Sequence, residues 1–151
     1  MINIEVRDVL NSDLEKVVEI ENLVFVAPWK KEDIIREINE NQFCKILVVT
    51  INEQVVGFMD YWVTFDSATI CQVGIHPNYQ RQGFGSRLMD EAIKDCYAKR
   101  VKNITLEVRA NNQKAINFYK KYGFKITLIK EAYYSNGEDA IYMIKEVNIN
   151  E

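Results

Sequence analysis

The sequence predicts an α/β (α+β) domain in which helices cover a mixed β-sheet. Stretches of alternating apolar and polar residues, typical of strands, are interspersed with stretches whose apolar residues recur every three or four positions, as in amphipathic helices. The length of 151 residues suits one domain over residues 1–151, and 48% hydrophobic with 27% charged residues is typical of globular proteins. No linker, repeat or low-complexity segment interrupts the chain. The predicted order is β-α-α-β-β-β-α-β-α-β-β.

The first half of the chain is expected to supply four strands and two helices. Ser12 and Glu15 form a capping-box pattern for a helix whose apolar residues recur over residues 14–24. A second, short helix is predicted over residues 31–39, with its isoleucines facing inward. Residues 52–54 are typical of a hairpin turn. The strands are predicted at residues 2–6, 46–51, 55–64 and 69–75.

The second half is expected to supply two helices and three strands. Gly83 and Gly85 precede an amphipathic helix that ends near Arg100. Another helix follows the N-cap candidate Asn112 and ends at Gly123, which suits the first position after a helix. The strands are predicted at residues 102–108, 124–131 and 139–145.

The charge and cysteine content exclude several classes of partner. Acidic residues outnumber basic ones by 22 to 19, the net charge is −3, and no run of five basic residues occurs, so no nucleic-acid partner is expected. No apolar stretch approaches the roughly 18 residues that span a bilayer, so no membrane partner is expected. Cys44, Cys71 and Cys96 form no CxxC pair, and this odd number of cysteines suits a reducing cytoplasm.

The single histidine, His76, restricts the chemistry further. It directly precedes Pro77 at a predicted strand end, which is typical of a turn residue. A zinc site would need a cluster of cysteines and histidines that the sequence lacks, so no metal is expected. A Ser-His-Asp triad would have to use the same histidine.

The glycine pair at the start of the third helix predicts a site for an anion. Unpaired N–H groups and the helix dipole both favour negative charge at a helix N-terminus. A phosphate-binding P-loop would need GK[ST], but Ser86 and Arg87 follow Gly85. A dinucleotide fingerprint would need a third glycine, where this chain has leucine. An anion other than these remains, and so does the simpler interpretation that the glycines only ease a tight turn.

Two motifs identify a family. The segment QRQGFG at residues 80–85 resembles the (Q/R)-x-x-G-x-(G/A) motif with which GNAT N-acetyltransferases bind acetyl-CoA, and AINFYKKYGF at residues 115–124 resembles their AxxxYxxxGF segment. The similarity covers nearly the whole chain. It implies acetyl-CoA as co-substrate and the GNAT fold, a mixed, mostly antiparallel sheet of about six to seven strands flanked by about four helices.

Finer features resemble the RimI-type branch of that family, the ribosomal-protein alanine N-acetyltransferases. They are APW at residues 27–29, LEVRANN at residues 106–112, and the tyrosine pair followed by EDA at residues 138–140. The resemblance implies that Glu107 is the general base and Tyr119 the general acid. It implies acetyl-CoA contacts at Val73, Gly74, Ile75, Arg81, Gln82, Gly83, Phe84, Gly85, Ser86 and Asn112. The substrate side is assigned to Trp29, Tyr133 and Tyr134. Lys30 departs from the branch, which often has a small capping residue there.

The chemistry of acetyl transfer suits these residue types. An α-amino group titrates near 7.7–8.0, so freeing it at pH 7 costs only about 1 to 1.4 kcal/mol, against about 4.6 kcal/mol for a lysine. Glu107 therefore suffices as a base, directly or through a water, and better if burial raises its basicity. Tyr119 suits protonation of the leaving thiolate, and a backbone N–H near Val73 to Ile75 suits the carbonyl oxygen.

Each of these residues also has a purely structural interpretation. Glu107 is the polar member of an alternating strand, where a solvated or salt-bridged residue is usual. Tyr119 lies on an apolar helix stripe, Asn112 suits an N-cap, and Trp29 suits a loop anchor. Tyr133 and its neighbour are expected to alternate on a strand, so that at most one faces a site. A solvated acidic face is expected for Asp13, Glu15, Glu19 and Glu21.

The sequence thus predicts a cytoplasmic enzyme that transfers acetyl directly, in a ternary complex, to the N-terminal amine of a protein or peptide. In the branch it resembles, that partner is a small-subunit ribosomal protein. A monomer or weak dimer is expected. Two alternatives stay open: the same chemistry on a small amine such as a polyamine or an aminoglycoside, and a non-catalytic acyl-CoA-binding module.

Overall fold

The structure of the chain is a computed structural model that describes residues 1–148. Within them, seven strands and four α-helices follow one another in the predicted order, joined by two short 3₁₀ helices. The strands are β1 (Ile4–Asp8), β2 (Cys44–Ile51), β3 (Gln54–Thr64), β4 (Ser67–Ile75), β5 (Asn103–Arg109), β6 (Lys125–Lys130) and β7 (Ala140–Glu146). The helices are α1 (Leu14–Val24), α2 (Lys31–Glu40), α3 (Phe84–Ala98) and α4 (Gln113–Lys121).

The strands form one seven-stranded sheet in the order β1-β2-β3-β4-β5-β7-β6. Strands β4 and β5 pair in parallel, whereas β1 with β2, β2 with β3, β5 with β7 and β6 with β7 pair antiparallel. The predicted mixed, mostly antiparallel sheet is therefore confirmed. The chain divides into two compact units: unit 1 holds residues 1–62 and 72–95, and unit 2 holds residues 63–71 and the chain from Cys96 onward.

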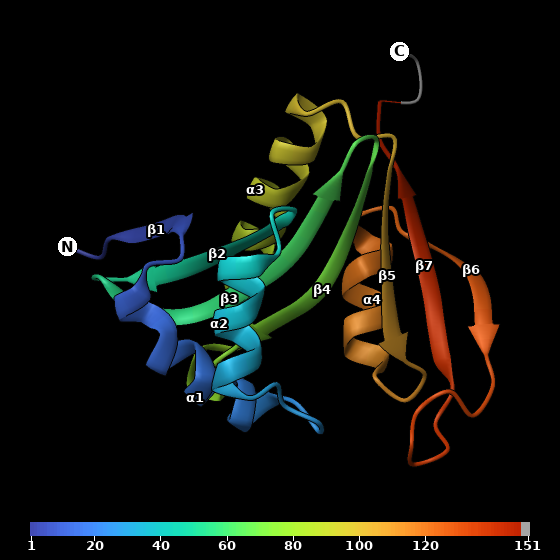
Figure 1. Cartoon of the computed structure of the whole chain (residues 1–151), viewed down its shortest axis with the longest axis horizontal. Helices are drawn as coiled ribbons and strands as arrows, with labels where there is room; N and C mark the ends of the chain where they lie inside the picture. The colour runs from blue at the N-terminus through green and yellow to red at the C-terminus, as the bar shows by residue number, and fades with distance from the viewer. Residues whose placement is uncertain (149–151) are drawn as a thin grey trace. The chain divides into compact units, whose positions relative to one another are not determined.

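Unit 1 buries both faces of its central hairpin. Along β3, Phe58 and Asp60 alternate with Met59 and Tyr61, and all four are nearly inaccessible to solvent. Helices α1 and α2, which lie together beside the strands in Figure 1, cover the face that carries Phe58. Tyr61 donates a hydrogen bond of 2.8 Å from its hydroxyl to Asp95 on α3, so α3 covers the opposite face. Burial on both sides explains why β2 and β3 are nearly continuous apolar runs.

The turn between β2 and β3 and an irregularity close to it together set the register of this hairpin. Asn52 and Glu53 have φ angles of 49° and 72°, which is the conformation of a two-residue turn of the hairpin type. The predicted hairpin at residues 52–54 is confirmed. It sets the pairing of Ile51 with Gln54, and an irregularity between Val49 and Thr50 then shifts the register so that Cys44 lies opposite Trp62.

The start of α1 differs from the prediction. Asp13 accepts a hydrogen bond of 2.7 Å from the backbone N–H of Leu10, and its carboxylate pairs with Arg7 at 2.7 Å. The capping box predicted for Ser12 and Glu15 is therefore wrong. The capping interaction is instead made by the Asp13 carboxylate, which binds the N–H of Leu10 at the start of a short 3₁₀ helix over Asn11–Asp13. The hydrogen bond from Arg7 holds the pKa of Asp13 below its usual value.

The predicted acidic face of α1 is only half correct. Glu15 and Glu19 are exposed, but Asp13 is 6% exposed and Glu21 is fully buried. Helical spacing places Glu21 within the apolar stripe, three residues from Val18 and Val24, and two hydrogen bonds satisfy its carboxylate there. They come from the backbone N–H of Trp29 at 3.1 Å and from Nε2 of Gln72 at 3.4 Å.

Unit 2 has one buried and one open sheet face. In β5, Leu106 and Val108 are buried and lie opposite Met143 and Ile141 of β7. Glu107 points to the other face, where the partially exposed Tyr142 lies opposite it. Helix α4 runs beside β5, with β7 and then the exposed strand β6 farther out, as Figure 1 shows. Among the described residues, no helix combines the length and apolar character needed to cross a lipid bilayer.

Candidate active site

The glycine pair forms the first turn of α3. Helix α3 begins at Phe84, and its first helical hydrogen bond runs from the N–H of Arg87 to the carbonyl of Gly83 at 3.2 Å. Gly83 has a φ of 84°, which requires glycine, and no atom lies within 4 Å of where a Cβ would stand. Gly85 lies inside the first turn rather than before the helix. The first-turn N–H groups of a helix have no helical acceptor, so this end suits an anion.

The glutamines of the QRQGFG segment brace the loop that leads into α3. Nε2 of Gln80 donates to the carbonyl of Ile75 at 3.0 Å, and Nε2 of Gln82 donates to the carbonyl of Asn78 at 3.4 Å. Arg81 between them is exposed with a φ of 63°. His76 accepts a hydrogen bond of 3.1 Å at Nδ1 from the N–H of Asn78, which confirms its prediction as a turn residue.

The end of β4 is shaped by close packing at Gly74. A Cβ there would lie 3.0 Å from the ring of Phe58 and 3.2 Å from the ring of Phe25. Glycine thus lets α1 and the loop after it approach the strand. Val73 and Ile75 on either side are partially exposed, so their side chains are not locked into the core of unit 1.

The loop between α1 and α2 is held by Glu21. Its carboxylate accepts the hydrogen bond from the N–H of Trp29, and the Trp29 ring packs against the core beneath α1 and α2. This geometry matches the loop-anchor interpretation of Trp29. Lys30 is the N-cap residue of α2, and Asp33 accepts a hydrogen bond of 3.2 Å from its N–H, so the helix start is stabilised without a small capping residue at Lys30.

In unit 2, Glu107 forms an ion pair, which agrees with its structural interpretation as a salt-bridged residue, although the sequence did not identify the partner. Lys130 on β6 donates to Oε1 of Glu107 at 2.9 Å. This hydrogen bond raises the pKa of Lys130 above its usual value, so the lysine stays charged. The lysine also lies 4.9 Å from the ring centre of Tyr133 and 5.4 Å from that of Tyr142. Only the strand order, in which β7 separates β5 from β6, brings Lys130 to Glu107.

Tyr119 is a buried residue of α4. Its ring centre lies 5.5 Å from that of Phe118 and 5.8 Å from that of Phe124. Burial raises the pKa of Tyr119 to about 12, so its phenol keeps its proton at neutral pH. Asn112 caps this helix by accepting a hydrogen bond of 3.2 Å from the N–H of Ala115, which confirms the predicted N-cap. No hydrogen bond joins Glu107 to Tyr119 within residues 1–148.

The tyrosine pair lies in a loop, so its predicted alternation on a strand is wrong. Strand β6 ends at Lys130, and Ala132 has a φ of 48°, which breaks the strand. The rings of Tyr133 and Tyr134 meet edge to face at 5.2 Å. Arg109 stacks 3.9 Å from the ring centre of Tyr134, while Tyr133 is 52% exposed. Each ring therefore contacts a cationic side chain close to Glu107: Tyr133 contacts Lys130, and Tyr134 contacts Arg109.

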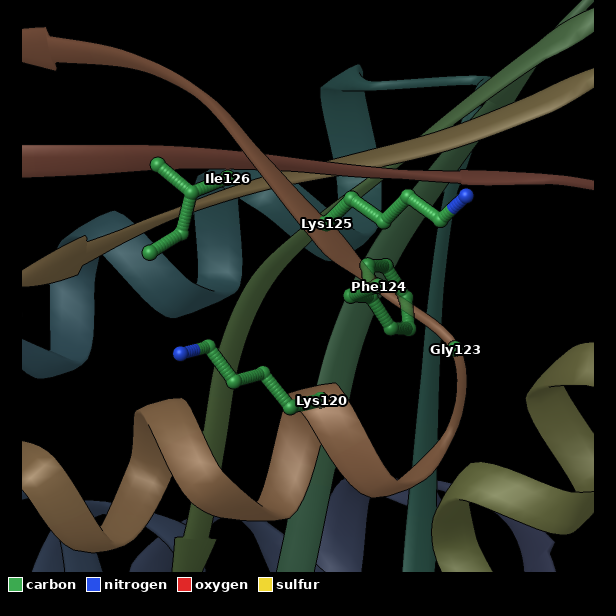
Figure 2. A pocket seen from close by; sticks show the side chains of 5 residues that line it. All are labelled: Lys120, Gly123, Phe124, Lys125 and Ile126. Carbon is green, nitrogen blue, oxygen red and sulfur yellow. The ribbon is translucent and has the colours of Figure 1, made fainter.

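A hollow of about 450 Å³ lies where α4 passes into β6. Figure 2 shows Lys120 and Ile126 on its two sides and Phe124 at the turn between them. Gly123 and Lys125 complete its lining. None of the residues predicted for catalysis or acetyl-CoA binding lines it.

Comparison with known proteins agrees with this arrangement. Residues 14–124 match the Acetyltransferase (GNAT) family. The chain belongs to this family. It is an acetyl-CoA-dependent N-acetyltransferase, as the two sequence motifs predicted.

Two relatives and one solved structure show how far the likeness extends. The Escherichia coli (strain K12) protein named ribosomal protein bS18-alanine N-acetyltransferase is 30% identical over 141 residues, covering 91% of this chain and 94% of the relative. A Bacillus subtilis (strain 168) relative, whose name gives the same activity as provisional, is 35% identical over 144 residues and 95% of both chains. The crystal structure of the ribosomal-protein-S18-alanine N-acetyltransferase from Escherichia coli matches with a TM-score of 0.89 at 29% identity, covering 97% of this chain and 96% of that chain.

Proposed function

We propose that this enzyme acetylates the N-terminal α-amine of a protein, with the small-subunit ribosomal protein bS18 as the foremost candidate substrate. The observation that carries the proposal is the likeness to relatives named for that reaction, which extends over nine-tenths or more of both chains. In this proposal the reaction takes place in the cytoplasm, by direct transfer from acetyl-CoA to the amine in a ternary complex, and the enzyme acts as a monomer or weak dimer.

Unit 1 supplies the donor side of the proposed site. The pyrophosphate of acetyl-CoA suits the open first turn of α3, with Gly83 at its mouth, because backbone N–H groups and the helix dipole favour an anion there. The backbone of Val73 to Ile75 suits the pantetheine arm, which extends as a strand does. Asn112 in unit 2 combines its capping role with a contact to the co-substrate.

Unit 2 supplies the acid and the base of the proposal. Glu107 takes the proton that the amine loses, directly or through one water, and Tyr119 protonates the departing thiolate of CoA. The nitrogen–carbon bond forms as the carbon–sulfur bond breaks. The proton lost by the amine is then on Glu107, and the thiolate has received the phenol proton of Tyr119. A phenol whose pKa is about 12 is protonated before each turnover and is a weak acid. It is a weaker acid than a thiol of pKa near 8.5, so protonation of the thiolate by Tyr119 runs uphill and contributes less than a phenol of ordinary pKa would.

Lys130 is a positioning residue in this scheme. Its hydrogen bond of 2.9 Å holds the Glu107 carboxylate in one orientation on the open face of β5. The exposed Tyr133 ring lies over Lys130, so Lys130 contacts both the loop that carries Tyr133 and the proposed base, Glu107.

The substrate class follows from the energetics of the amine. A carboxylate base of ordinary strength suffices for an α-amine, whose deprotonation at pH 7 costs about 1 to 1.4 kcal/mol, but not for a lysine at about 4.6 kcal/mol. The N-terminal amine of a peptide is therefore the favoured acceptor. A small polyamine carries amines closer to lysine in basicity and is the weaker candidate.

Peptides that differ only in their first residues test the proposal. The release of CoA thiol is measured with a peptide that begins as bS18 does, with the same peptide blocked at its α-amine, and with spermidine and an aminoglycoside. Transfer to the free bS18 peptide alone is expected. Transfer to the small amines but not to the peptide would replace the proposal with small-molecule acetylation. Binding of CoA without any transfer would indicate a non-catalytic module.

A further inference from the structure

Three side chains of unit 1 that acetyl transfer does not use converge beneath α2. Glu37 on α2, Cys44 on β2 and Asp60 on β3 each place a possible ligand atom within 4.8 Å of the others. The β2–β3 register explains the convergence. Cys44 lies opposite Trp62 and Ile46 lies opposite Asp60, so the thiol and the Asp60 carboxylate project from the same face of the hairpin. That face is the one that α2 covers.

The Asp60 carboxylate is buried without a charge partner among the described residues. It is 1% exposed, its Oδ2 has no hydrogen-bond partner, and its Oδ1 accepts only from the Cys44 thiol at 3.4 Å. Burial first, and the neighbouring Glu37 charge second, raise the pKa of Asp60 to about 7. A buried carboxylate beside a second carboxylate is costly unless a proton or a cation compensates the charge.

We propose that Glu37, Cys44 and Asp60 bind a divalent cation of the Zn²⁺ type. Two carboxylate oxygens and one thiolate form a mixed donor set that suits borderline-soft Zn²⁺ better than the hard ions Mg²⁺ and Ca²⁺. Three protein ligands leave a fourth tetrahedral position for water. Binding releases the proton of the Cys44 thiol, and the proton that neutralises Asp60 in the metal-free protein, into solvent.

The surroundings of the cluster support this assignment. The indole Nε1 of Trp62 and Nδ2 of Asn41 both donate to Oε1 of Glu37, which fixes that carboxylate and leaves Oε2 as its ligand atom. Glu37 and Cys44 are partially exposed while Asp60 is buried, so a cation reaches the site from the α2 side. The site is not evident from the sequence, because two of its ligands are carboxylates and no Cys/His cluster marks it. The hairpin register brings Cys44 to Asp60, and the packing of α2 adds Glu37.

The experiment uses the full chain after treatment with a chelator. Zn²⁺ is titrated by calorimetry, and Co²⁺ is titrated as a spectroscopic probe, since a cobalt–thiolate bond gives a charge-transfer absorption that oxygen ligands do not. One saturable equivalent of each metal is expected, with a charge-transfer band for Co²⁺ and no comparable binding of Mg²⁺ or Ca²⁺. Absence of saturable Zn²⁺ binding would overturn the proposal and leave Asp60 neutralised by a proton.

Matched variants locate the metal. Cys44→Ser is expected to abolish the cobalt charge-transfer band, and Asp60→Asn to weaken Zn²⁺ affinity more than about tenfold. Cys71→Ser, which removes another partially exposed thiol outside the cluster, is expected to bind as the wild type does. A band that survives in Cys44→Ser or is lost in Cys71→Ser would overturn the assignment. Thermal unfolding of each metal-free variant confirms folding, and none of these readings depends on acetyl transfer.

Discussion

Strands β3 and β5 show how differently the two units treat an acidic residue. In β3 both faces are covered, and Asp60 is buried at 1% exposure beside Glu37 and Cys44. In β5 one face is open, and Glu107 keeps a side-chain exposure of 30% with Lys130 as its partner. A charge that is buried on both sides must be compensated by structure, whereas a charge on an open, paired face is available to a substrate. The open face of unit 2 is therefore where an acid–base residue is useful.

The largest effect is expected where β3 is buried on both faces. Phe58 is 2% exposed at the centre of unit 1, so Phe58→Ala is expected to lower the free energy of unfolding by about 3–5 kcal/mol. Leu128 on β6 is 52% exposed, and Leu128→Ala is expected to change the free energy of unfolding by less than about 0.5 kcal/mol. Urea unfolding monitors both variants. Similar losses in the two would contradict the contrast between a closed and an open sheet.

The contribution of the buried Asp13, at the start of α1, to stability is expected to depend on pH. Its depressed pKa means that the Asp13–Arg7 pair stabilises the fold above the ordinary value of 3.8 and loses this contribution as pH falls through the lower, folded value. Asp13→Asn is expected to cost about 1.5–3 kcal/mol at pH 7 and to flatten the loss of stability below pH 4. Glu19→Gln, at an exposed ion pair on the same helix, is the control and is expected to change stability little. An unchanged acid profile in Asp13→Asn would refute the role of this pair.

At the proposed base and acid, substitution is expected to affect turnover. Glu107→Gln and Tyr119→Phe are each expected to lower kcat more than about tenfold with CoA binding intact, because general acid–base groups usually contribute at least that much. Steady-state kinetics with the bS18 peptide and a CoA-binding assay measure the two quantities. Glu131→Gln, at an exposed position just after β6, serves as the control. Wild-type rates in both variants would remove the assigned roles.

The smallest effect is expected at the partner of Glu107. Lys130→Met is expected to lower kcat severalfold without changing the KM for acetyl-CoA, because the lysine orients the base rather than the donor. Lys130→Arg keeps the charge and the hydrogen bond and is expected to restore most of the rate. Lys125→Met on the same strand lines the hollow of Figure 2 and is expected to leave kcat unchanged. An equal loss in both Met variants would indicate a general effect of β6 on the fold.

Most of the architecture was predictable because it depends on local pattern. The order of the strands and helices, the turn at Asn52 and Glu53, the cap at Asn112 and the end of α4 at Gly123 follow from residues close together in sequence. Two of the errors came from hydrogen bonds that the helical pattern does not reveal. Asp13 and Glu21 were expected on a solvated face, but both are buried. Asp13 is paired with Arg7, and Glu21 accepts a hydrogen bond from the N–H of Trp29.

The sequence by itself determined the family, the motif at the start of α3 and the candidate acid and base. Glycine at a positive φ and tyrosine on a helix stripe leave a signal within a few residues, so they are legible without a fold. Only the tertiary structure decided that Lys130 pairs with Glu107 and that Asp60 is buried beside Cys44 and Glu37. Both depend on strand order and register, because pairing brings together residues separated by sixteen or more positions.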